Sequence, residues 1–191
     1  VKPGDTIKAG TTMSVEFVRV NHSIPDACAF AIRTPAGLIV LTGDFKVDFT
    51  PISGEPIDLV RFGELGSEGV LALLSDSTNA EKPGSTPSER IVGESFEKLF
   101  KRAADKRIII ATFASNVHRI QQVVDTAVRF DRKVAVFGRS MVNVVAIAQE
   151  LGYLTIPAGI LIDADNLKDY SDDEIVLITT GSQGEPMSAL T

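Results

Sequence analysis

The sequence has one cysteine, no tryptophan and two histidines among 191 residues. A single cysteine forms no intrachain disulfide, which favours a reducing compartment, and we expect a cytoplasmic protein. No apolar run approaches the ~18 residues of a membrane-spanning helix. No basic-then-apolar leader opens the chain, so we expect neither a membrane anchor nor secretion. Hydrophobic residues make up 44% of the chain, which is ordinary for a domain with a buried core.

The net charge of −6 conceals an uneven distribution. Residues 90–140 carry 11 Lys and Arg against 5 Asp and Glu, a net +6, whereas residues 141–191 carry 1 against 8, a net −7. A solvated helix face is the simplest interpretation of the basic segment. The alternative is that part of it lines a nucleic-acid channel, because a local excess of positive charge attracts a polyanion.

Apolar periodicity in the first part of the chain predicts strands. Residues 13–20 alternate apolar and polar side chains as a half-buried strand does, and residues 38–41 form a short, wholly apolar strand. A turn with Pro and Gly at 34–37 joins that strand to another at 27–33, which predicts a hairpin. The Pro- and Gly-containing stretch at 82–85 is the expected linker between two domains.

Strands and helices alternate after the linker, and this order predicts an α/β fold with a Rossmann-like parallel sheet. The expected elements are a helix that starts at a capping box at 86–89 and continues to 104, a strand at 107–113, a helix at 117–128, a strand at 133–137, a helix at 141–151 and a strand at 175–179.

Two polar residues that follow predicted strands are the first candidates for chemistry. His22 comes after the strand at 13–20 and Asp44 after the strand at 38–41, so adjacent strands would deliver both to one edge of a sheet. An imidazole and a carboxylate that converge make half of a metal site. On chemistry alone, a hydrogen-bonded structural role stays open for each of them.

Further polar groups follow other predicted strands. Asp76 comes directly after the apolar run 69–74, and residues 115–118 open a predicted helix. The latter are Ser115, Asn116, Val117 and His118. Ser or Asn is a good N-cap, and the free amides of a helix N-terminus favour an anion. A simple cap beside an exposed histidine is the alternative. The loop at 180–186 has two glycines but lacks the Gly-x-Gly-x-x-Gly dinucleotide fingerprint.

The motifs taken together resemble a known family. Asn-His-Ser-Ile-Pro-Asp at 21–26 and Gly-Asp-Phe-Lys-Val-Asp at 43–48 are similar to late motifs of the metallo-β-lactamase fold in its β-CASP branch. Ser-Asp-Ser-Thr-Asn at 75–79, Thr-Phe-Ala-Ser-Asn-Val-His-Arg at 112–119 and the loop at 180–186 narrow the resemblance to the ribonuclease J family. The resemblance covers essentially the whole chain. It implies a partial metallo-β-lactamase αββα sandwich at 1–82, followed by a partial β-CASP domain at 83–191.

The resemblance also implies a function. It indicates a two-zinc hydrolase that cuts RNA from the 5′ end and internally, in mRNA decay and ribosomal RNA maturation, and that assembles as a homodimer or homotetramer. His22 would bind one zinc ion, Asp44 would bridge both, and Asp76 would help to position catalytic groups. The segment that would hold RNA comprises Ser115, Asn116, Val117 and His118.

The chain departs from the family pattern in its histidines. The family's His-x-His-x-Asp-His cluster, its later histidine ligand and its glycine- and histidine-containing RNA-binding motif are absent. A zinc site wants roughly four ligands, and the chain offers two. Because it begins at Val1 within a strand-and-turn pattern, we interpret it as an internal fragment that binds zinc weakly and does not cleave RNA by itself.

Two other classes of function stay open. One is a different metallo-β-lactamase or β-CASP hydrolase that acts on DNA, RNA 3′ ends or a small ester. The other is a non-catalytic, nucleotide-binding Rossmann-like module at 84–191, for which residues 1–80 serve as a scaffold.

Overall fold

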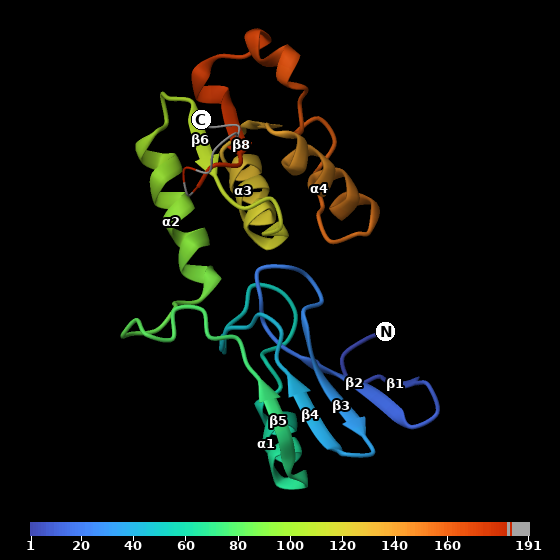
Figure 1. The fold of residues 1–191 in the computed structure, drawn as a ribbon. Helices are drawn as coiled ribbons and strands as arrows, with labels where there is room; N and C mark the ends of the chain where they lie inside the picture. Colours follow the sequence, from blue (N-terminus) through green and yellow to red (C-terminus); the bar gives the residue numbers. More distant parts are fainter. Residues whose placement is uncertain (183, 185–191) are drawn as a thin grey trace. The chain divides into compact units, whose positions relative to one another are not determined.

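The computed structural model describes residues 1–182 and 184. The chain divides into two compact units, Val1–Ser88 and Glu89–Thr191, each described below by itself (Figure 1). The division falls after Ser88, whereas the linker pattern placed it after residue 82. The assignment of the two parts to named domain types stays a prediction. Within the described residues, no helix is long and apolar enough to cross a membrane.

The first unit is built on one five-stranded sheet in the order β1-β2-β3-β4-β5. Strands β1 to β4 pair antiparallel with their neighbours, and β5 pairs parallel with β4 after the crossover helix α1. The elements are β1 Thr6–Ala9, β2 Met13–Arg19, β3 Cys28–Thr34, β4 Gly37–Leu41, α1 Leu59–Glu68 and β5 Val70–Leu74. The hairpin expected from the turn at 34–37 is the β3–β4 pair.

Helix α1 and the residues before it supply the core of this unit. Asp58 caps the helix, because its side chain accepts a hydrogen bond from the backbone N–H of Arg61 at 2.9 Å. Leu65 on α1 is 1% exposed, and a leucine buried to this degree contributes roughly 1.5–3 kcal/mol. It belongs to one cluster with alternate residues at and directly after the strands, Val18, Val20, Ala29, Ala31, Leu38 and Val40, and with Ile57 in the segment before α1. In β2 the buried face carries Glu16 and Val18, while Met13 is exposed and Val15 and Phe17 are half-buried, so the alternation predicts the strand but not its buried face.

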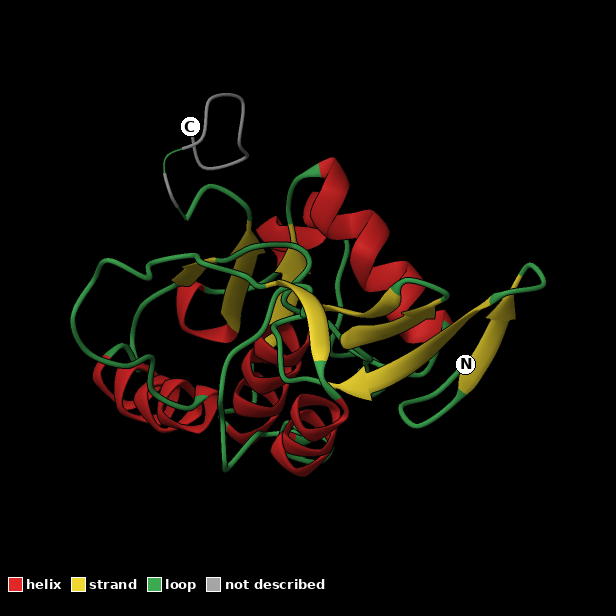
Figure 2. Ribbon diagram, turned by 60° about the horizontal axis from the view of Figure 1, so that its bottom comes forward, coloured by secondary structure: helices red, strands yellow, loops and turns green. Residues whose placement is uncertain are grey.

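The second unit contains a three-stranded parallel sheet in the order β6-β8-β7 (Figure 2). Its elements are α2 Glu89–Arg102, β6 Ile108–Ala111, α3 Val117–Arg129, β7 Lys133–Val136, α4 Arg139–Glu150, the 3₁₀ helices η1 Ala164–Asp169 and η2 Asp172–Glu174, and β8 Ile175–Thr179. Side chains from all three strands and the three α-helices form its core, with Phe100 and Val124 fully buried.

The α/β fold class predicted from the sequence is confirmed. A mixed sheet in the first unit and a parallel three-stranded sheet in the second are what a metallo-β-lactamase part followed by a β-CASP part would show. Helix α1 and strand β1 were not predicted from the sequence. Both omissions concern the first unit.

Candidate metal centre and nucleic-acid loop

Three strands of the first unit end at the same edge of the sheet. Strands β2 and β4 are both antiparallel to β3, which lies between them, and therefore run in the same direction. Strand β5 is parallel to β4 and shares this direction (Figure 1). His22, Asp44 and Asp76 follow the ends of β2, β4 and β5 within two or three residues. His22 and Asp44 were expected to follow adjacent strands; β3 instead lies between β2 and β4, and both residues still reach one edge.

His22 and Asp44 are in contact. The ring nitrogen Nε2 of His22 lies 3.7 Å from Oδ2 of Asp44. The half-buried imidazole also lies 3.5 Å from the hydroxyl of Ser23, while the carboxylate is mostly exposed. The pair is thus a nitrogen and an oxygen donor open to solvent at the rim of the sheet.

The backbone beside this pair is fixed by Asn21. The N–H of Lys46 donates to the carbonyl of Asn21 at 2.8 Å, which ties the loop after β4 to the residue before His22. The Asn21 side chain donates to the carbonyl of Glu55 and accepts from the N–H of Ile57, at 3.0 and 2.9 Å. Asn21 belongs to the 21–26 motif, but no sequence pattern indicates this bridging role.

Gly43 shapes the turn that leads to Asp44. Its φ of +58° lies in the left-handed region that glycine tolerates best. A Cβ at this position would meet the carbonyl oxygen of Cys28 at 3.3 Å. The turn therefore needs a residue without a side chain where the chain passes β3.

Asp76 faces the same edge. Asp44 and Asp76 line one hollow of about 220 Å³ together with Leu41, Gly43, Leu74 and Ser75. The Asp76 carboxylate accepts a hydrogen bond from the backbone N–H of Thr78 at 2.8 Å. The hydroxyl and the N–H of Thr78, the N–H of Phe45 and the charge of His22 hold the pKa of Asp76 below its usual range. A second carboxylate, which would attract a cation, thus stands beside the His22–Asp44 pair.

The donor set suits a first-row divalent metal in part. Two ligands bound at 2.0–2.1 Å to a tetrahedral ion lie roughly 3.4 Å apart, close to the 3.7 Å between His22 and Asp44. Within residues 1–182 and 184, no group of three or more His, Cys, Asp or Glu side chains is arranged to hold an ion. The described residues therefore supply two of the roughly four ligands that zinc takes.

The predicted RNA-binding loop opens helix α3. Asn116 is the N-cap, and its side chain accepts from the N–H of Arg119 at 3.1 Å. Asn116 and Val117 are both buried, Val117 within the core of the second unit. Ser115 is exposed and His118 is half-buried. Ser115 is therefore accessible at the start of α3, while the buried Asn116 and Val117 hold the backbone in place.

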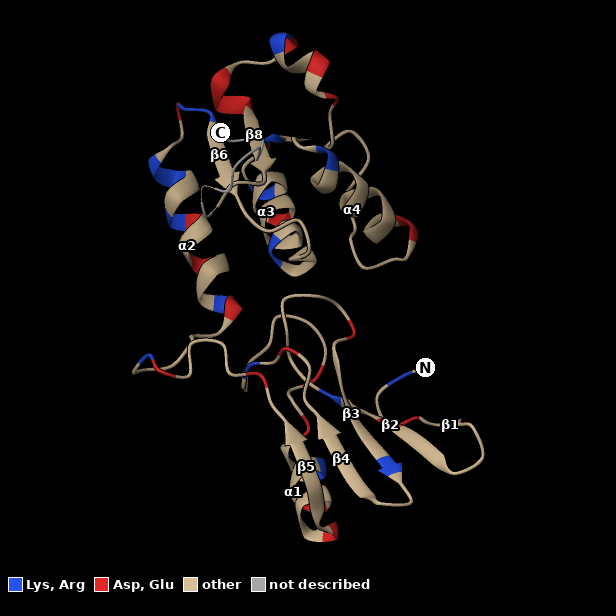
Figure 3. Cartoon of the chain, in the orientation of Figure 1, with Lys and Arg blue, Asp and Glu red and all other residues tan. Residues whose placement is uncertain are grey.

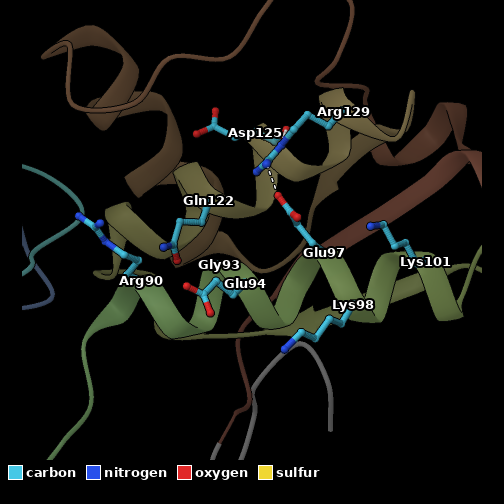
Figure 4. A pocket seen from close by; sticks show the side chains of 9 residues that line it. All are labelled: Arg90, Gly93, Glu94, Glu97, Lys98, Lys101, Gln122, Asp125 and Arg129. Carbon is cyan, nitrogen blue, oxygen red and sulfur yellow. Dashed lines mark hydrogen bonds and ion pairs between the residues drawn. The ribbon is translucent and has the colours of Figure 1, made fainter.

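In the second unit, the basic and the acidic residues lie on different elements. Lys and Arg gather on α2 and near the ends of α3, and Asp and Glu gather on η1 and η2 (Figure 3). A hollow of about 470 Å³ between α2 and α3 is lined by basic side chains, including Arg90, Lys98 and Arg129, and by carboxylates (Figure 4). Arg129 is ion-paired with Glu97 there. The mixture of signs favours a solvated helix pair over a nucleic-acid channel at this place.

The loop at 180–186 is described only in part. Gly181 has φ of +108°, a conformation that favours glycine. Gln183, Glu185 and Pro186 lie outside the described residues.

Comparison with known proteins identifies the class of domain first. Residues 105–191 match the family model described as "Ribonuclease J, beta-CASP domain". A solved structure titled "Crystal Structure of a Protein of Unknown Function from Enterococcus faecalis V583" superposes with a TM-score of 0.67 and 21% identity. The superposition covers 96% of this chain and 45% of the chain in that structure. At 21% identity it shows only that the two folds are similar.

The curated relatives then give the family. The chain is 46% identical to "Ribonuclease J" of Synechocystis sp. over its whole length and 30% of that protein. It is 51% identical to "Ribonuclease J 1" of Streptococcus pyogenes over 93% of the chain and 31% of that protein. Against "Ribonuclease J" of Helicobacter pylori it is 49% identical over 92% of the chain and 25% of that protein. The chain belongs to the ribonuclease J family and spans a quarter to a third of the length of these relatives.

Proposed function

We propose that the protein of which this chain is a part is a metal-dependent ribonuclease that hydrolyses RNA phosphodiesters. One observation carries the proposal: an imidazole and a carboxylate from separate strands, His22 and Asp44, approach to 3.7 Å at a shared sheet edge. They do so in a chain 45–51% identical to proteins named ribonuclease J. Nitrogen and oxygen donors at this spacing are suited to zinc.

His22, Asp44 and Asp76 would have different roles at the metal centre. His22 would bind one zinc ion through its ring nitrogen, and Asp44 would bridge two. When bound, such a metal pair lowers the pKa of a water towards neutrality and neutralises charge that develops on the phosphate. Asp76 keeps its negative charge beside His22, because the hydroxyl and the N–H of Thr78 hold the pKa of Asp76 below its usual range. It would orient the metal-binding groups.

RNA would be held by the loop before α3. Ser115 would donate its exposed hydroxyl to a phosphate oxygen, and the N-terminal amides of α3 favour the same negative charge. Asn116 and Val117 would fix that backbone, and His118 would add a donor or a positive charge. We further propose 5′-to-3′ and internal cleavage in cytoplasmic mRNA decay and rRNA maturation, by a homodimer or homotetramer.

The isolated chain is proposed to be inactive. Its described residues supply two ligands at the metal edge, and the family's histidine cluster is absent from its sequence. Two ligands hold zinc weakly, so the remaining ligands have to come from the rest of the longer protein.

The test uses the full-length protein and a fluorescent, 5′-monophosphorylated single-stranded RNA, with DNA of the same sequence in parallel. We expect RNA cleavage that is lost on chelation and restored by zinc. His22→Ala should lower the rate at least about 100-fold, more than the loss of a residue that merely supports a ligand. Asp105→Asn, which changes an exposed carboxylate of the second unit, serves as the control and should be neutral. Cleavage of DNA alone, or full activity in His22→Ala, would refute the proposal.

A further inference from the structure

We propose that Thr42 is a positioning residue of the metal centre, whose hydroxyl joins the loop that carries Asp44 to the loop that carries Asp76. The inference rests on the proposed function and names a residue that the motifs did not single out. Thr42 is the first residue after β4 and is 6% exposed. It therefore lies beneath the rim and does not itself reach a ligand in solution.

The hydroxyl of Thr42 makes two hydrogen bonds, one as an acceptor and one as a donor. It accepts from the backbone N–H of Asp76 at 2.9 Å and donates to the carbonyl of Gly43 at 2.8 Å. The backbone N–H of Thr42 donates to the carbonyl of Leu74 at 3.0 Å and so extends the β4–β5 pairing. The regular β4–β5 pairing thus ends at Thr42. Beyond it, the Thr42 hydroxyl connects the loop after β4 to the loop after β5.

These bonds join the two loops beside Asp44. The bond to the Gly43 carbonyl fixes the peptide plane that leads directly into Asp44. The bond from the N–H of Asp76 fixes the backbone of the neighbouring loop. One hydroxyl therefore holds the peptide before Asp44 and the backbone of Asp76 together.

The arrangement separates positioning from folding. The β4–β5 register from Leu38 to Leu41 uses backbone atoms alone and does not need the Thr42 side chain. Loss of the hydroxyl would leave this pairing intact but would free the two loop ends. Because groups that hold a metal ligand commonly affect metal affinity 10–100-fold, the effect should appear in zinc binding.

The experiment compares three variants of the full-length protein. Thr42→Val removes the hydroxyl at nearly equal volume, and Thr42→Ser keeps it. Thr126→Val is the matched control: Thr126 is fully buried and its hydroxyl donates to the carbonyl of Gln122 at 2.7 Å, within α3. Zinc affinity of the metal-free protein is measured by calorimetric titration, and kcat and KM for single-stranded RNA are measured separately.

We expect Thr42→Val to weaken zinc binding and to lower kcat, each about 10–100-fold, with KM unchanged. Thr42→Ser should remain within about threefold of wild type, and Thr126→Val should bind zinc as wild type does. Equal zinc affinity in Thr42→Val and wild type would overturn the inference, as would a Thr42→Ser variant as defective as Thr42→Val. If Thr42→Val fails to fold, Thr42→Ala provides the same comparison.

The outcome also separates this inference from the proposed function. If Asp44→Asn still cleaves RNA at the wild-type rate, the proposed function fails. If Asp44→Asn is inactive while Thr42→Val binds zinc and cleaves RNA normally, only the role of Thr42 fails.

Discussion

Glu16 should set the acid sensitivity of the first unit. This carboxylate is 8% exposed and lies between two guanidinium groups. Arg61 donates to it through Nε and Nη2 at 2.6 and 3.0 Å, and Arg33 donates through Nη1 at 2.8 Å. The bonds from Arg61, and then those from Arg33, outweigh the opposing effect of burial and lower the pKa of Glu16 from 4.5 to about 2.

The free energy follows from the difference between the folded and unfolded pKa values. One pKa unit corresponds to about 1.4 kcal/mol, so the ionised Glu16 stabilises the folded state by about 3 kcal/mol. Because the folded pKa is the lower one, this stability is fully present above the unfolded value of 4.5 and is lost as the pH falls towards 2. At pH 3, about 2 kcal/mol of it should be gone.

The assay is urea unfolding at pH 7 and pH 3, followed by circular dichroism. Glu16→Gln should destabilise the chain by about 2–3 kcal/mol at pH 7, and its loss of stability between pH 7 and pH 3 should be about 2 kcal/mol smaller than that of wild type. Glu64→Gln is the control: Glu64 pairs with the same Arg61 at 2.6 Å but is 57% exposed, so it should cost less than about 1 kcal/mol. Equal pH dependence in Glu16→Gln and wild type would refute the reasoning.

Two further predictions concern the second unit. Asn116→Ala removes the cap of α3 and should cost about 1 kcal/mol, whereas Asn116→Asp keeps an acceptor for the N–H of Arg119 and should cost less; thermal unfolding distinguishes them. Arg132 is 2% exposed and donates to the carbonyls of Ala103, Ala104 and Lys106 at 2.6–3.1 Å, so Arg132→Met leaves buried acceptors unpaired and should cost about 2–4 kcal/mol in urea unfolding. An unchanged midpoint would contradict the assigned role.

The regular parts of the fold were predictable because their patterns are local. The alternation at 13–20 predicts a strand, and β2 forms there, but the most buried positions are Glu16, Val18 and Val20. The helix α3 buries Val117, Ile120 and Val124 at helical spacing, as the sequence indicates. Helix α1 was missed because Gly63 and Gly66 weaken its helical pattern and the Pro- and Gly-containing segment before it reads as a loop. The N-cap Asp58 was the available signal.

The candidate site was predictable in its members but not in its connections. The ends of apolar runs locate His22, Asp44 and Asp76. Their convergence depends on strand direction and order, and these arise from pairing between distant residues. The role of the Thr42 hydroxyl could not be predicted from the sequence, because threonine is common directly after a strand. Its significance depends on the N–H of Asp76, 34 residues away.

The most direct measurement is the rate of RNA cleavage by the full-length protein carrying Asp44→Asn, with its zinc content determined in the same preparation. Asparagine keeps the size of the side chain but removes the negative charge that would bridge two metal ions. We predict a fall of at least about 100-fold in kcat together with a loss of bound zinc. Wild-type cleavage with full zinc content would contradict the account.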